Sequence, residues 1–112
     1  MKYISYNGEK LGFYLDNYAN NGNLYVSLYT QNNEDYADLS INLPNYLLEF
    51  EEEIVINGDV SSNLVKKLVD KGILIDTFKT AYSGFGTYKV MYFNREIAKD
   101  YIIADYSFNY EE

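Results

Sequence analysis

Apolar and polar positions alternate through much of the first half of the chain, which is the pattern of strands with one buried face. Three runs share this alternation: Leu11, Phe13 and Leu15; Leu24, Val26 and Leu28; and Ala37, Leu39, Ile41 and Leu43. The dipeptides Asn7-Gly8 and Asn21-Gly22 suit the positive φ angles of type I′ hairpin turns. The first half is therefore predicted to form an antiparallel meander.

The second half begins with a predicted helix from Val60 to Lys71. Its apolar residues fall on one stripe: Val60, Leu64, Val65, Leu68 and Val69. Asp59 or Ser61 is placed to cap its first N–H groups, and Gly72 suits the residue that follows a helix. Residues 54–56, 74–80 and 87–93 are predicted strands.

The tail has two interpretations. Asn94 can cap a short helix, whereas Tyr106, Phe108 and Tyr110 alternate like a terminal strand. Together, the elements predict one α+β domain over residues 1–112. It would contain an antiparallel sheet of about five to six strands with one main helix packed on one face.

The composition excludes most familiar enzyme chemistry. The chain has no Cys, no His and no Trp, so it can form no Ser-His-Asp triad, no Cys nucleophile and no zinc site of ordinary composition. Adjacent Glu51, Glu52 and Glu53 cannot all point into one site if the chain is extended there. We therefore expect no enzyme, no metal and no cofactor. An enzyme that uses carboxylates alone is the least favoured alternative.

No stretch approaches the roughly 18 apolar residues of a membrane span. The first six residues also lack the apolar region of a signal peptide. These features predict a cytoplasmic protein without a membrane partner.

The net charge of −8 belongs to residues 1–65, which hold ten acids and two bases, while residues 66–112 hold seven of each. From Leu11 through Val65 there is no Lys or Arg. Because phosphate recognition depends on these two residue types, direct nucleic-acid binding is disfavoured. The acids either confer solubility or face a cationic partner.

The polar positions of the alternating runs form a second face, rich in tyrosine and acid. Such tyrosines either pack across neighbouring strands or make an interaction face, since Tyr offers a large contact area with a polar tip. The same tyrosines can pack across strands and also form an interaction face. With the adjoining acidic loops, this face gives the candidate partner-binding residues: Tyr14, Asp16, Tyr18, Tyr25, Tyr29, Glu34, Asp35, Tyr36, Asp38, Glu51, Glu52 and Glu53.

The segments Tyr18–Leu24 and Tyr36–Pro44 resemble a family of short acidic proteins of unknown function, found on phages and conjugative elements of Firmicutes. The similarity continues through Leu64–Lys71 and Ser83–Tyr88, and the chain departs from the family near Ile56–Asp59. The resemblance transfers no catalytic residue. It implies a mobile-element setting, where small acidic proteins often counter host defence.

These observations predict a non-enzymatic acidic binding protein of a phage or mobile element. The role that we expect is an anti-CRISPR or anti-restriction inhibitor, which as a DNA mimic blocks the basic nucleic-acid-binding channel of a host nuclease. The alternative is a structural or regulatory accessory module of a mobile element, which self-associates through its tyrosines, for instance as a homodimer.

Overall fold

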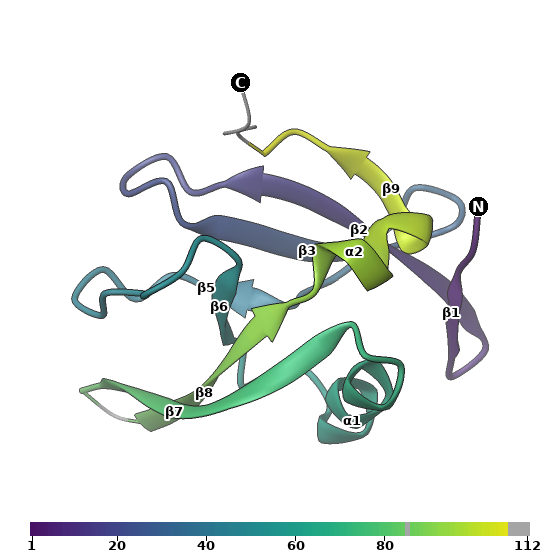
Figure 1. Ribbon diagram of the computed structural model, residues 1–112. Helices are drawn as coiled ribbons and strands as arrows, with labels where there is room; N and C mark the ends of the chain where they lie inside the picture. The colour runs from purple at the N-terminus through teal and green to yellow at the C-terminus, as the bar shows by residue number, and fades with distance from the viewer. Residues whose placement is uncertain (85, 108–112) are drawn as a thin grey trace.

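The computed structural model describes residues 1–84 and 86–107, and within these ranges the strands form two β-sheets (Figure 1). The first sheet has the antiparallel order β1 (Ile4–Tyr6), β2 (Glu9–Asn17), β3 (Leu24–Thr30) and β4 (Asp35–Asp38). Strand β9 (Ile102–Asp105) pairs in parallel with β2. The second sheet has the order β5-β6-β8-β7, with all pairs antiparallel. Its strands are β5 (Ser40–Ile41), β6 (Glu53–Ile56), β7 (Leu74–Ser83) and β8 (Gly86–Phe93).

The expectation of one sheet under one main helix is wrong. The third alternating run is divided at Leu39, so that β4 stays in the first sheet and β5 enters the second. The buried Leu39 lies at the change between the sheets: its N–H donates to the Val26 carbonyl of β3 (3.0 Å), and its carbonyl accepts from the N–H of Asn57, directly after β6 (2.9 Å). The chain therefore changes sheets without a break in its alternation.

Helix α1 (Ser62–Asp70) lies within the predicted span, and its two ends follow the sequence signals. The Ser61 hydroxyl accepts from the Asn63 N–H (3.1 Å) at the start. At the end, Gly72 has φ 81°, and the N–H groups of Gly72 and Ile73 bond to the carbonyls of Val69 and Leu68. This is the pattern of a Schellman motif.

The main core lies between the two sheets. The apolar positions of the first two predicted runs are all buried there, with Leu64 and Leu68 of α1 and apolar residues of β6, β7 and β8. Phe13 of β2 meets Phe93 of β8 edge to face, with ring centroids 5.2 Å apart. A smaller cluster of Val55, Ala81 and Val90 packs under half-buried apolar residues that include Leu43, Tyr46 and Leu48.

The chain after β8 contains a short helix, which confirms the first interpretation of the tail as far as Ala98. Helix α2 (Arg95–Ala98) is capped by Asn94, whose side-chain oxygen accepts from the Ile97 N–H, and continues into the 3₁₀ helix η1 (Lys99–Tyr101). β9 follows, then Tyr106, whereas Phe108 and Tyr110 lie outside the described residues. In the described part of the chain, no helix is long and apolar enough to cross a membrane.

The return of the chain to β2 depends on a glycine. A Cβ atom at Gly12 would lie 2.7 Å from the Ile103 side chain and 2.9 Å from the Tyr101 carbonyl oxygen. Real Cβ atoms do not approach other atoms so closely, so Gly12 allows η1 and β9 to lie against β2.

Candidate partner-binding face

The outward side of the first sheet is covered by tyrosine rings that pack in pairs across β2 and β3. Tyr14 stacks on Tyr29, with centroids 3.9 Å apart and planes inclined by 16°. Tyr18, directly after β2, meets Tyr25 edge to face at 5.3 Å. This confirms cross-strand packing, and all four rings remain half-buried. We call this surface the tyrosine face: Tyr14, Asp16, Tyr18, Tyr25, Ser27, Tyr29 and Asp38.

Hydrogen bonds fix the tips of three of these rings, and Tyr29 is held by its stacking on Tyr14. The Tyr25 hydroxyl donates to Asp38 Oδ1 (2.7 Å), and Ser27 Oγ donates to the same oxygen (3.2 Å). Tyr18 and Ser40 share a hydrogen bond between their hydroxyls (2.9 Å), and Tyr14 donates to Asn33 Oδ1 (3.0 Å). The rings are therefore held in place before any partner arrives, which lowers the entropic cost of binding.

Two of these hydroxyls, those of Tyr18 and Tyr25, have raised pKa values. Burial raises the pKa of Tyr25 to about 12, where the hydrogen bond with Ser27 opposes the rise and Asp38 adds to it. Burial also raises the pKa of Tyr18, against the lowering effect of Ser40 and with a further contribution from Asp38. Both hydroxyls are protonated at neutral pH, and that of Tyr25 donates to Asp38.

The raised pKa of Tyr25 predicts a loss of stability in alkali. The native pKa of about 12 exceeds the value of about 10 for an unfolded tyrosine, so the native state binds more protons between these pH values. The contribution is fully present below about pH 10 and is lost as pH rises toward about 12. We expect Tyr25→Phe to make the decline of unfolding free energy shallower in urea melts from pH 8 to pH 11. Tyr82→Phe, on a 72% exposed ring of β7, is the matched control, and equal slopes in all three proteins would contradict the prediction.

Four carboxylates on and beside the tyrosine face form no ion pair within the part of the chain that the structure describes. Asp16 and Asp38 belong to the face, while Glu34 and Asp35 lie at its edge, in the β3–β4 turn and at the start of β4. Among residues 1–84 and 86–107, none of the ion pairs includes any of these four side chains. Tyr36, also on β4, is 36% exposed at the same edge. The edge of the first sheet therefore presents uncompensated negative charge beside aromatic rings.

The acidic run at the start of β6 is arranged differently, because the carboxylates of Glu49, Glu52 and Glu53 form ion pairs within the chain. Glu53 is 2% exposed and accepts from Lys79 Nζ (2.5 Å) and from the Glu49 N–H (3.0 Å). Lys79 also pairs with Glu49 (2.7 Å). Hydrogen bonds to Glu49 and Glu53 raise the pKa of Lys79, so its ammonium group stays charged at neutral pH. Glu53 is part of the interior rather than a surface that a partner could touch.

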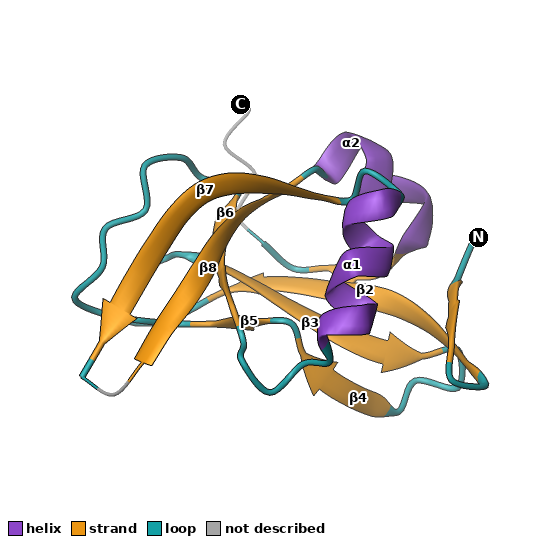
Figure 2. Cartoon of the chain, turned by 90° about the horizontal axis from the view of Figure 1, so that it is seen from below, coloured by secondary structure: helices purple, strands orange, loops and turns teal. Residues whose placement is uncertain are grey.

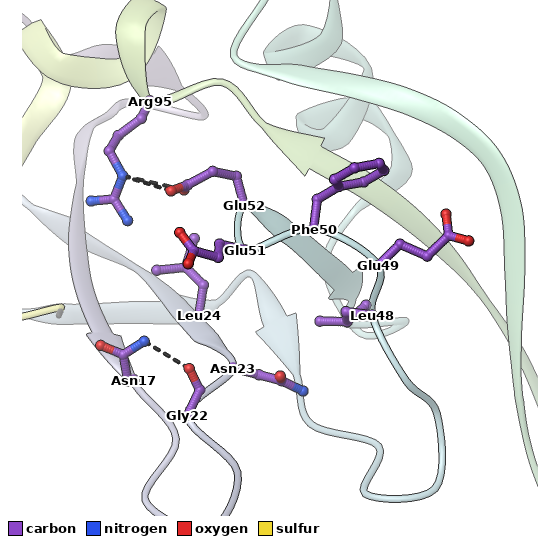
Figure 3. A pocket seen from close by; sticks show the side chains of 10 residues that line it. All are labelled: Asn17, Gly22, Asn23, Leu24, Leu48, Glu49, Phe50, Glu51, Glu52 and Arg95. Carbon is purple, nitrogen blue, oxygen red and sulfur yellow. Dashed lines mark hydrogen bonds and ion pairs between the residues drawn. The ribbon is translucent and has the colours of Figure 1, made fainter. Parts of the chain in front are cut away.

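Glu52 is bound as well. Figure 3 shows Arg95 of α2 against Glu52, with Nε 3.2 Å from Oε1, at a pocket of about 220 Å³. Arg95 Nη1 also contacts Asp105 (2.8 Å) and Ser107 Oγ (3.2 Å), so this guanidinium joins the acidic loop to the tail. Glu51 is exposed, and no ion pair of the described residues includes it. Of Glu51, Glu52 and Glu53, all three predicted for partner binding, the structure leaves Glu51 accessible.

A family profile covers most of this chain. The profile of DUF4313, a domain of unknown function, matches residues 12–110. No curated protein and no solved structure matches the chain. The resemblance to a family of unknown function is thereby confirmed, whereas the phage and Firmicutes setting stays a prediction. On this match, the chain belongs to the DUF4313 family.

Proposed function

We propose that this protein is a non-enzymatic acidic binding protein, and that its tyrosine face occupies the basic nucleic-acid-binding channel of a host nuclease. In the mobile-element setting that the sequence resemblance implies, it would act as an anti-CRISPR or anti-restriction inhibitor. The observation that carries the proposal is a group of four carboxylates that form no ion pair with another described residue, Asp16, Glu34, Asp35 and Asp38, beside tyrosines that hydrogen bonds already fix.

The chemistry of this surface suits lysine and arginine. A carboxylate accepts two hydrogen bonds from a guanidinium, as a phosphate does, and an arginine can stack on a tyrosine ring. Uncompensated charge also attracts a basic partner from a distance and accelerates encounter, in a way that salt weakens. The paired rings Tyr14–Tyr29 and Tyr18–Tyr25 would form the centre of the contact, with Glu34, Asp35 and Tyr36 at its rim.

Self-association through the same face has weaker support. Two copies that met there would each bring the four uncompensated carboxylates to one interface, and like charges in contact oppose association. Charged edge strands such as β4 also discourage strand-to-strand pairing. We therefore keep this alternative as an outcome of the experiment.

The test is inhibition of DNA cleavage by a panel of purified CRISPR effectors and restriction nucleases. For a nuclease that the protein inhibits, Asp16→Lys/Asp35→Lys should raise the inhibitory concentration about tenfold or more. Tyr25→Ala should raise it about thirtyfold, because truncating a central hot-spot tyrosine costs about 2 kcal/mol. Asp59→Lys/Glu96→Lys makes the same change in net charge at exposed positions that are not part of the tyrosine face, and it should have little effect.

Each variant must first be shown to fold, by circular dichroism and thermal melting. The proposal fails if no nuclease of the panel is inhibited, or if both face variants inhibit as strongly as the parent protein. A change of oligomeric state in the face variants, without inhibition by the parent, would favour the self-associating module instead.

A further inference from the structure

The apolar stripe of α1 extends beyond the residues that the core buries. Leu64 and Leu68 are fully buried, but Val65 and Val69 are half-buried. These two valines line a groove of about 500 Å³ between α1 and the second sheet, on the side where Figure 2 shows α1 beside the β7–β8 hairpin. Its other apolar walls come from β6, β8 and the turn before α1: Ile56, Val60, Tyr88 and Met91.

A phenylalanine projects from the strand next to this groove. Phe78 is 90% exposed and has φ 62°, a left-handed conformation that is unfavourable for a bulky side chain. It lies in a bulge of β7, where the pairing with β8 shifts between Asp76 and Lys79. The Phe78 N–H donates to Asp76 Oδ1 (2.8 Å), and Thr77 Oγ1 donates to the Val90 carbonyl (2.6 Å). Side-chain hydrogen bonds thus stabilise a conformation that keeps the phenyl ring in solvent.

The Phe78 backbone lies beside the groove, because its N–H donates to Asp76, which lines the groove. A projection beside a recess is self-complementary under a twofold axis, since the ring of each copy can enter the groove of the other. Sites of roughly 300–1,000 Å³ hold drug-sized ligands, so a groove of about 500 Å³ has room for one phenyl ring.

The charge around the groove permits two copies to meet. Its charged residues form two ion pairs, Lys66 with Asp70 (3.2 Å) and Lys89 with Asp76 (3.8 Å), so the rim is neutral. The first half of the chain, by contrast, carries the whole net charge of −8. A twofold contact at the groove therefore avoids the repulsion that the tyrosine face would produce, and a lysine of one rim can face a carboxylate of the other.

We propose that the protein forms a homodimer in which Phe78 of each copy fills the groove between α1 and β8 of the other. This dimer does not depend on the proposed inhibition of a nuclease. It leaves the tyrosine face of each copy uncovered, so that one dimer presents two acidic faces.

Sedimentation equilibrium of the purified full chain tests the dimer. Phe78→Gly removes the ring and suits the left-handed backbone, so it should raise the dimer dissociation constant about tenfold or more without lowering the melting temperature of the monomer, measured at concentrations below that constant. Val69→Lys places a charge in the groove and should weaken the dimer to a similar extent. Tyr82→Ala removes a 72% exposed ring that does not line the groove and should leave the dimer unchanged.

Mixing the two variants identifies the contact itself. The Phe78→Gly chain keeps its groove and the Val69→Lys chain keeps its ring, so a mixed dimer retains one of the two contacts. The mixture should associate more tightly than either variant alone. The inference is overturned if the parent chain is a monomer at about 100 μM. It is also overturned if the Phe78→Gly and Val69→Lys chains each dimerise as tightly as the parent, or if the mixture of the two variants associates no more tightly than either variant alone. If Val69→Lys fails to fold, the test is the dissociation constant of the Phe78→Gly dimer. A value equal to that of the parent then overturns the inference.

Discussion

Phe93→Ala is expected to lower the free energy of unfolding by about 3–5 kcal/mol, because the ring is fully buried where the two sheets meet. Its edge-to-face contact with Phe13 joins β8 of the second sheet to β2 of the first. Truncation removes this contact and leaves a cavity between two sheets that hydrogen bonds hold in place, so the site cannot collapse fully.

Urea denaturation followed by circular dichroism measures the loss, with Leu47→Ala as the matched control. Leu47 is 87% exposed, and its truncation should change the unfolding free energy by no more than about 0.5 kcal/mol. A loss below about 1 kcal/mol for Phe93→Ala would show that the sheets do not pack against each other at this pair.

Local signals in the sequence predicted most of the elements, but they predicted neither β9 nor the division of the strands into two sheets. The alternation of Leu11 to Leu15 and of Leu24 to Leu28 predicted buried positions correctly, and Ser61 and Gly72 marked the ends of α1. At Leu39, however, alternation continues while the hydrogen-bonding partner changes from β3 to the chain after β6. Periodicity records which side of a strand is buried, and it carries no information on which sheet the strand joins.

The candidate site shows the same limit. Alternation placed the tyrosines on one face, because side-chain direction in a strand is a local property. It could not show that Glu53 and Glu52 are bound by Lys79 and Arg95, which follow them by 26 and 43 residues. The exposed Phe78 was also missed, since its bulge contains no glycine to indicate a positive φ.

The two proposed surfaces divide the molecule by charge. The paired acids next to β6 hold the acidic loop and the tail in place, while the acids of the first sheet stay uncompensated. The second sheet and α1 instead present a neutral rim around apolar walls. A charged partner is therefore expected at the first sheet and an apolar, self-complementary contact at the second, so substitutions at one surface should leave binding at the other unchanged.

Neighbouring residues of α1 should differ strongly in their contribution to stability, because Leu68 faces the core and Val69 faces the groove. Leu68→Ala is expected to lower the free energy of unfolding by about 2–5 kcal/mol, because Leu68 is fully buried in the main core. Val69→Ala, one residue further along the helix, removes two carbon atoms from a half-buried side chain and should cost about 1 kcal/mol or less. Urea denaturation of both variants, at protein concentrations low enough to keep them monomeric, gives the comparison.

If Val69→Ala costs as much as Leu68→Ala, the groove is closed in solution and has no room for a second copy. If Leu68→Ala costs less than about 1 kcal/mol, α1 is not anchored to the core and the groove has no fixed wall.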